Sequence, residues 1–129
     1  MNSDFTNDFI ALFLPDGILE YFEIIDYKRT ESNQYLYEKR LIIHLSEKKI
    51  VPQEYAKHQY KASGFSAARN IEDFPIRNML VTLSIKRRRW DVIINGETKK
   101  VSRDWNQIIA QGTRMSDEFA AFLKETSQY

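Results

Sequence analysis

The sequence predicts an α+β fold made of a small antiparallel sheet, a projecting basic β-hairpin and a C-terminal helix. Three observations lead to this prediction. The composition, with 43% hydrophobic and 29% charged residues, is typical of a soluble globular protein. The middle of the chain contains several runs rich in β-branched and aromatic residues, which favour strands. Both ends carry apolar residues at helical spacing, and 129 residues suffice for one domain.

The N-terminal stretch predicts a short helix followed by a hairpin. Thr6 or Asn7 is suited to begin the helix, and Pro15 is suited to stop it. Residues 18–30 begin like a helix but end in strand formers, and residues 35–47 are equally rich in strand formers. The polar link ESNQ between these two runs predicts that they form a hairpin.

The next stretch gives weaker signals. Residues 51–65 predict a helical turn at Pro52 and then a weak strand. Residues 70–78, NIEDFPIRN, predict a loop, since Pro75 restricts the residue before it to extended geometry. The acidic residues of this loop, Glu72 and Asp73, have no partners at a telling spacing and are interpreted as a solvated turn.

Residues 79–85 predict a buried strand. One face of this strand is apolar and consists of Met79, Val81, Leu83 and Ile85. If the same pleat continued, Arg87 and Arg89 would point into the core, at a prohibitive cost for unpaired charges. The strand must therefore leave the core by about Ile85.

Residues 86–105 predict a projecting two-stranded hairpin. Its turn is Asn95-Gly96, a strong hairpin signal because both residues tolerate the positive φ of a type I′ turn. Counting outward from this turn gives the pairs Ile94–Glu97, Ile93–Thr98, Val92–Lys99, Asp91–Lys100, Trp90–Val101, Arg89–Ser102 and Arg88–Arg103. Because Arg88 and Arg103 repel one another, this register predicts an anion or another acceptor between them.

The hairpin region concentrates positive charge. Residues 77–114 hold nine basic and three acidic side chains, a local net charge of +6 in a chain whose overall charge is +1. Charge gathered in this way attracts polyanions, and β-ribbons fit nucleic-acid grooves. The candidate DNA-binding residues are Lys86, Arg87, Arg88, Arg89, Trp90, Lys99, Lys100, Arg103, Trp105 and Arg114. The alternative is an edge hairpin that charge protects from aggregation, with Trp90 packed on Val101 as a small core.

The last stretch, residues 113–129, predicts a helix that follows an α+β domain of residues 1–112. Ser116 suits the N-cap, and the acidic residues after it suit the positive end of the helix dipole. The apolar stripe of this helix consists of Met115, Phe119, Phe122 and Leu123. Its periodicity leaves two alternatives: the helix packs on the sheet of its own domain, or on helices that this chain lacks.

Several kinds of site are not expected. Without cysteine, and with only two histidines, the chain predicts no structural zinc site and no cofactor. It has no phosphate-binding glycine loop, and His44 lacks a recognisable serine or acid partner and is interpreted as a core residue. The longest apolar run has six residues and the N-terminus lacks a basic signal region, so we expect a cytoplasmic protein without a membrane segment.

Three stretches, IEDFPIRNMLVTLSIKRRRW, KVSRDW and GTRMSDEFAAFLKE, together resemble the N-terminal region of an insertion-sequence transposase whose catalytic part is encoded separately. The likeness extends back through FLPDGILEYFEIIDY and so covers most of the chain. In related transposases this region resembles a zinc-ribbon module followed by a helix-turn-helix that helps recognise the terminal inverted repeats. Here DVIINGETKK stands where the cysteines would fall, so the hairpin is zinc-ribbon-like but without zinc ligands. The resemblance makes the C-terminal helix the first of an incomplete helix-turn-helix.

The expected function is that of a non-catalytic DNA-binding region of a transposase, which contacts transposon ends through its arginine-rich hairpin. Catalysis of the kind that the resemblance implies needs three carboxylates on an RNase H-like sheet, for which this chain has no room. The expected partners are double-stranded DNA and a separately encoded catalytic polypeptide, with a homo-oligomer as a further option. The alternative is a protein-interaction or assembly module of a transposase complex without direct DNA contact.

Overall fold

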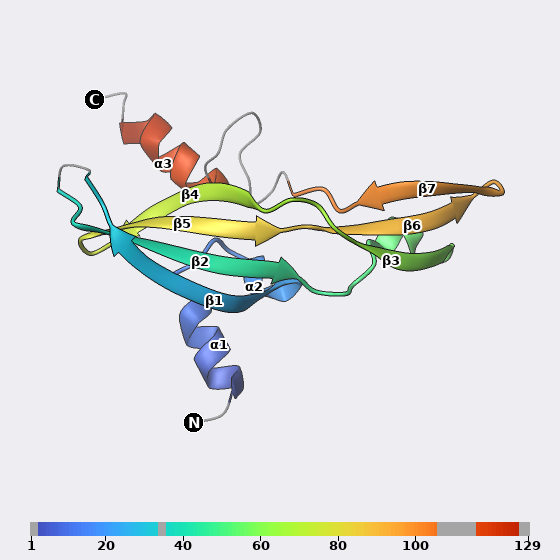
Figure 1. Ribbon diagram of the computed structural model, residues 1–129, viewed down its shortest axis with the longest axis horizontal. Coiled ribbons are helices and arrows are strands. Elements are labelled where there is room, and N and C mark those ends of the chain that lie inside the picture. Colours follow the sequence, from blue (N-terminus) through green and yellow to red (C-terminus); the bar gives the residue numbers. More distant parts are fainter. Residues whose placement is uncertain (1–2, 34–35, 106–115, 127–129) are drawn as a thin grey trace.

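The computed structural model describes residues 3–33, 36–105 and 116–126, which form two β-sheets and several short helices (Figure 1). The elements follow in the order α1 (Ser3–Ala11), α2 (Ile18–Tyr21), β1 (Phe22–Glu31), β2 (Lys39–Glu47), the 3-10 helix η1 (Gln53–Tyr55), β3 (Gln59–Phe65), β4 (Arg69–Ile76), β5 (Met79–Lys86), β6 (Arg88–Ile94), β7 (Glu97–Ser102) and α3 (Asp117–Thr126). The predicted α+β class is confirmed.

The two sheets share one continuous stretch of chain. The larger sheet has the strand order β1-β2-β5-β4, and the smaller sheet has the order β3-β6-β7. Neighbouring strands are antiparallel except β2 and β5, which are parallel. The chain passes from β5 in one sheet to β6 in the other with only Arg87 between them (Figure 1). The sequence predicted a two-stranded arm, and β3 adds the third strand that makes this arm a sheet.

The main core lies on one face of the larger sheet. β5 is a central strand, and its register places Leu83 beside Ile43 of β2 and Ile71 of β4. These side chains pack with Ile18 and the other buried apolar residues, which are Leu14, Phe22, Leu45, Val81, Ile85 and Trp105. The apolar face predicted for residues 79–85 is therefore confirmed, with Met79 half-buried at its end.

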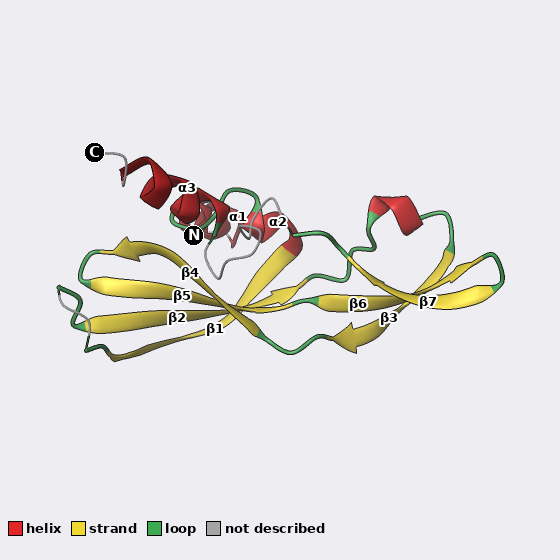
Figure 2. Ribbon diagram, turned by 90° about the horizontal axis from the view of Figure 1, so that it is seen from above, coloured by secondary structure: helices red, strands yellow, loops and turns green. Residues whose placement is uncertain are grey.

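The smaller sheet has a buried face of its own. Trp90 is 1% exposed and Val92 is 0% exposed, and both lie on the same face of β6. Figure 2 shows the 3-10 helix η1 on the same side of the molecule as α1, α2 and α3. Among the described residues no helix lies on the opposite side, where both sheets present what we call the open face (Figure 2).

Residues 69–76 form strand β4, so the prediction of a loop over residues 70–78 was wrong. The proline that suggested a loop is accommodated because β4 is an edge strand and its pairing with β5 is irregular between Asp73 and Ile76. The extended geometry that Pro75 imposes on Phe74 suits a strand equally well. The first helix begins at Ser3 and not at Thr6 or Asn7.

Helix α3 packs on this edge strand. The Ser116 hydroxyl accepts a hydrogen bond from the N–H of Phe119 at 3.2 Å, as predicted for the N-cap, and donates one to Oδ1 of Asp73 at 2.7 Å. Phe74 contacts the rings of Phe119 and Phe122, with centroids 5.2 and 5.4 Å apart. Of the two alternatives that periodicity left open, these contacts support packing on the helix's own domain. The boundary expected between residues 112 and 113 lies outside the described residues.

The described part of the chain contains no helix that is both long enough and apolar enough to cross a membrane.

Candidate nucleic-acid interface

The arginine run lies where the larger sheet passes into the smaller. Between β5 and β6 the ladder is interrupted at Arg87, whose carbonyl accepts a hydrogen bond from the N–H of Ser66 at 2.8 Å. The interruption shifts the alternation of the strand by one residue. Arg88 therefore shares the packed face of β6 with Trp90, and Arg89 is exposed on the open face. The predicted exit of the strand from the core near Ile85 is confirmed.

Two of the candidate arginines are held against aromatic rings. The guanidinium carbon of Arg88 lies 4.4 Å from the ring centroid of Phe65. That of Arg103 lies 4.5 Å from the ring centroid of Tyr21, and its Nη2 donates a hydrogen bond to the carbonyl of Ile50 at 3.0 Å. Both side chains are half-buried. Cation–π contacts of this kind stabilise a fold by about 0.5 to 2 kcal/mol each, so these two arginines support the junction between the sheets.

The register of β6 and β7 ends at Arg89 and Ser102, so the predicted pair of Arg88 and Arg103 is not formed, but both arginines have an acidic residue of the chain itself near them. Glu47 at the end of β2 is 2% exposed, and its Oε1 accepts a hydrogen bond from the backbone N–H of Arg88 at 3.0 Å. Burial raises the pKa of Glu47 above its ordinary 4.5, and this hydrogen bond and the charges of Arg103 and Arg88 oppose the rise. The two arginines thus have an internal carboxylate near them and need no external anion to offset their repulsion.

Both tryptophans of the hairpin region are core residues. Trp90 is 1% exposed and meets Tyr60 edge-on, with centroids 5.8 Å apart. Trp105 is 7% exposed and packs on Phe22 at 4.6 Å. Because these indoles are enclosed, a nucleic-acid base cannot stack on them in this arrangement. The expectation that Trp90 is a small core residue against Val101 is confirmed by their register.

The remaining candidates point outward or lie half-buried at the surface. Lys86, Arg89, Lys99 and Lys100 are exposed, Arg87 is half-buried, and Arg114 lies outside the described residues. The register separates the two neighbouring lysines. Lys100 pairs with Asp91 and shares the open face with Arg89, whereas Lys99 pairs with Val92 and shares the packed face.

A row of charged side chains crosses the open face of the smaller sheet. Lys61, Asp91 and Lys100 are in register on its three strands, and Nζ of Lys100 lies 2.9 Å from Oδ1 of Asp91. This hydrogen bond lowers the pKa of Asp91 below its ordinary 3.8, and the charge of Lys61 acts in the same direction. An open hollow of about 420 Å³ lies here, lined by Gln59, Tyr60, Lys61, Asp91, Ile93 and Thr98. Asp91 offsets part of the positive charge that an anion would meet.

A second hollow lies at the junction of the two sheets. It has a volume of about 410 Å³ and is lined by Ala67, Ala68, Arg69, Asn70 and Arg87. Nε of Arg87 is buried and makes no hydrogen bond. Nε of Arg88 and of Arg103 also lacks a hydrogen bond, but those guanidiniums lie on aromatic rings. The junction hollow therefore combines two guanidinium groups with a small, mostly polar space.

Sequence reasoning missed two basic residues that the fold brings to this region: Lys61 on the open face and Arg69 beside the junction hollow. Lys61 lies in a weak strand whose partner could not be identified before the pairing of β3 with β6 was known. Arg69 begins β4, directly before the residues that were predicted as a loop. The one available signal was the alternation in residues 59–65, which sets Lys61 on the face opposite to Tyr60.

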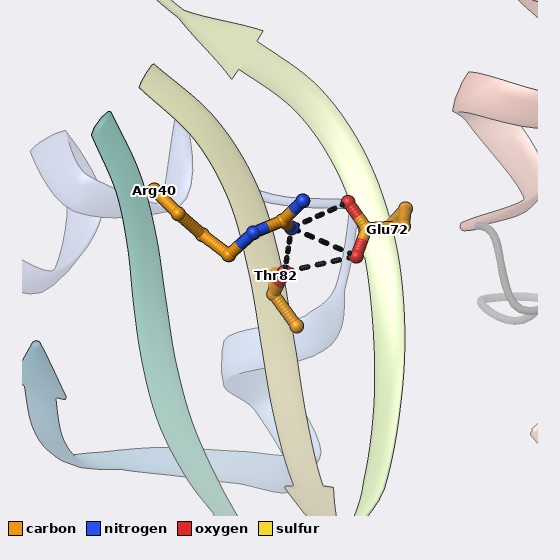
Figure 3. Close-up of polar contacts among 3 residues, drawn as sticks. All are labelled: Arg40, Glu72 and Thr82. Carbon is orange, nitrogen blue, oxygen red and sulfur yellow. Dashed lines mark hydrogen bonds and ion pairs between the residues drawn. The ribbon is translucent and has the colours of Figure 1, made fainter. Parts of the chain in front are cut away.

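Figure 3 shows a polar network on the open face of the larger sheet, where Arg40 of β2 reaches across β5 to Glu72 of β4. Nη1 of Arg40 lies 3.0 Å from both carboxylate oxygens of Glu72, and the Thr82 hydroxyl donates to Oε1 of Glu72 at 2.9 Å. The interpretation of Glu72 and Asp73 as a solvated turn was wrong, since Asp73 is 4% exposed and bound by Ser116. Their partners come from distant strands and could not be found by spacing.

His44 also has neighbours that spacing did not reveal. In register across three strands, it lies between Asp26 of β1 and Ser84 of β5. These side chains and Lys86 line a hollow of about 300 Å³, together with Ile25, Leu45 and Ala68. The row has the residue types of a proton relay. Oδ1 of Asp26 accepts a hydrogen bond from the neighbouring N–H of Tyr27 at 2.8 Å. The side chains of this described row form no hydrogen bond with one another, so they do not connect into a relay in this structure.

Within the described residues, no group of three or more histidine, cysteine, aspartate or glutamate side chains is arranged to hold a metal ion. The chain matches no protein-family model, and it matches no curated protein and no solved structure.

Proposed function

We propose that this chain is the non-catalytic N-terminal region of a transposase and that it binds the DNA of the transposon ends. The family part of this proposal rests on the resemblance of residues 71–90, 100–105 and 112–125. The DNA-binding part rests on one observation: Arg69 and Arg87 line a hollow at the junction of the two sheets, and Arg87 follows the exposed Lys86 in the chain. Guanidinium groups bind phosphate oxygens through strong, charge-assisted hydrogen bonds.

Some of the predicted DNA-binding residues are packed within the fold, and others lie at the surface. Arg88, Arg103, Trp90 and Trp105 hold the junction together through aromatic and backbone contacts. The surface that we propose for phosphates, which we call the basic surface, consists of Lys61, Lys86, Arg87, Arg89 and Lys100. Phosphate contacts of this kind position a protein on a duplex without reading its sequence.

Two neighbouring lysines provide a matched test. Lys100→Ala removes a charge from the basic surface, whereas Lys99→Ala removes the same charge from the other face of the same strand. In anisotropy titrations with a labelled duplex, we expect Lys100→Ala and Arg89→Ala to weaken binding several-fold and Lys99→Ala to change it little. Equal losses for Lys99→Ala and Lys100→Ala would mean that the duplex does not distinguish the two faces.

A protein-interaction module is the second candidate, since α1 and the turn after it expose large apolar side chains: Phe5, Phe9, Leu12 and Phe13. The partner expected from the resemblance is the separately encoded catalytic polypeptide. If the chain binds no duplex at low salt but captures that polypeptide, the second candidate is correct and the basic surface serves another purpose.

A further inference from the structure

We propose that a second copy of this chain binds along β1, so that two copies join their larger sheets edge to edge in an antiparallel, two-fold arrangement. This inference is independent of the proposed function. β1 is an outer strand of the larger sheet and spans ten residues, nine of which are exposed. The outward backbone groups of such a strand are a template for pairing with another strand. The covering, the apolar surface and the charge of this edge favour a second copy as its occupant.

The two outer strands of the larger sheet are covered differently. At β4, the N–H of Ser116 donates a hydrogen bond to the carbonyl of Glu72 at 2.9 Å, and α3 packs beside the strand. At β1, the described residues provide a strand partner on one side only, which is β2. β1 is therefore the long edge that this chain leaves open within its described part.

The side chains of β1 are unusually apolar for a free edge. Tyr27 is 65% exposed, Ile25 is 60% exposed and Ile24 is 37% exposed. Ile24 and Tyr27 are in register with Leu45 and Ile43 of β2 and so lie on the core face of the sheet. The core face is thus incompletely covered where β1 forms the edge, which is typical of an interaction surface.

The charges of β1 select the partner and its direction. The first half of the strand carries Glu23 and Asp26. The second half carries Lys28, Arg29 and Glu31, and Glu31 forms an ion pair with Lys39 of β2. Antiparallel pairing of two copies sets the acidic half of each against the basic half of the other, whereas parallel pairing in register sets like charges together. β1 is therefore complementary to itself when it is reversed, as a two-fold interface requires.

One register satisfies both the charges and the faces. If Glu23 of one copy lies opposite Lys28 of the other, Ile24 lies opposite Tyr27, and Ile25, at the irregularity in the pairing of β1 with β2, lies opposite Asp26. Glu23 and Lys28 both lie on the open face, because they pair with Ser46 and Ile42 of β2. Since directly opposed residues must share a face, this register forms two ion pairs on the open face and two apolar pairs on the core face.

Helix α1 supplies apolar cover at the same edge. It extends past β1 on the side away from β2, and it lies on the helical side of the sheet (Figures 1 and 2). Phe9 of this helix is 55% exposed, and Leu12 and Phe13 just after its end are 78% and 53% exposed. The rings of Phe9 and Phe13 touch, with centroids 5.4 Å apart. When two copies join through β1, both α1 helices come to the side on which Tyr27 is exposed, where they can cover it.

Charge exchange tests this arrangement in the full chain. We expect sedimentation equilibrium to show a reversible dimer, and we expect Glu23→Lys and Lys28→Glu each to raise its dissociation constant about tenfold, because each places like charges opposite one another twice. The double variant Glu23→Lys/Lys28→Glu restores both pairs and should regain the parental constant. Thermal melts of each variant check whether these exposed substitutions leave the fold intact.

A second pair of variants tests the apolar part. Phe9→Ser should weaken the dimer, while Lys57→Glu, an exposed substitution after η1, should leave it unchanged. A chain that stays monomeric up to about 100 μM, where interfaces of standard size are well populated, contradicts the proposal. If neither single charge reversal changes the dissociation constant of the dimer, or if the double variant does not regain the parental constant, β1 is not the interface.

Discussion

Arg88 shows how the surroundings of a single residue change its role. As part of the run KRRRW it was predicted to contact DNA, but its guanidinium lies over Phe65 and its backbone N–H binds Glu47. We expect Arg88→Ala to lower the free energy of unfolding by about 1 to 2 kcal/mol, since it loses the cation–π contact and a charge beside a buried carboxylate. Urea denaturation measures this loss. The salt dependence of duplex binding should stay unchanged, and a shallower dependence would return Arg88 to the interface.

Asp91 acts against the proposed function at its own position. It lies between Lys61 and Lys100 on the open face and forms an ion pair with Lys100. Replacing it by asparagine removes one negative charge and frees Lys100 for a phosphate. We expect Asp91→Asn to strengthen duplex binding several-fold and to steepen its salt dependence by up to about one unit. Asp104→Asn provides a comparison, because it removes the same charge outside this row.

At the scale of elements, local signals predicted the hairpin well. The Asn95-Gly96 turn has positive φ at both residues, 52° and 80°, and the pairs from Ile94–Glu97 to Arg89–Ser102 match the observed register. The prediction succeeded because a two-residue turn fixes the register of the two strands that it joins. β3 pairs with the distant β6, and its weak alternation could not place it from sequence. β4 pairs with the next strand, β5, but its proline suggested a loop.

Helix α3 is joined to β4 through a single hydroxyl group. Ser116 is fully buried, caps the helix and donates a hydrogen bond to the buried Asp73. Ser116→Ala removes the cap and leaves a buried carboxylate without this donor, which should cost about 2 to 4 kcal/mol. Amide exchange in α3 should become markedly faster. Ser102→Ala, in an exposed position of β7, serves as the control. Equal exchange in both variants would show that α3 is held by other contacts.

At the scale of the whole molecule, two buried carboxylates should make stability depend on pH. Burial raises the pKa of Glu47 above 4.5 and that of Asp73 above 3.8. The folded state therefore binds protons at higher pH than the unfolded state does, and the free energy of unfolding should rise as pH falls from neutral toward about 4.5. Urea denaturation at several pH values measures this, and Glu47→Gln should flatten the curve. A stability that falls over this range would contradict the assignment.

The candidate site could be predicted from sequence only in part. The charge count of residues 77–114 identified the region that holds most of the proposed basic surface, because a high density of arginine and lysine is visible without a structure. Charge alone could not separate Arg89, which is exposed, from Arg88, which is packed on Phe65. That distinction depends on the interruption at Arg87, where the alternation of the strand shifts by one residue as the chain enters the second sheet.

The salt dependence of duplex binding tests the central claim most directly. If Lys86, Arg87, Arg89 and one further residue of the basic surface contact phosphates, a plot of log affinity against log salt should have a slope near about −3.6. A fourfold rise in salt should then weaken binding by about two orders of magnitude. Replacing Arg87 by alanine should make the slope shallower by about one unit for every duplex sequence alike. A duplex affinity that does not change with salt, or a slope that Arg87→Ala leaves unchanged, would contradict the account.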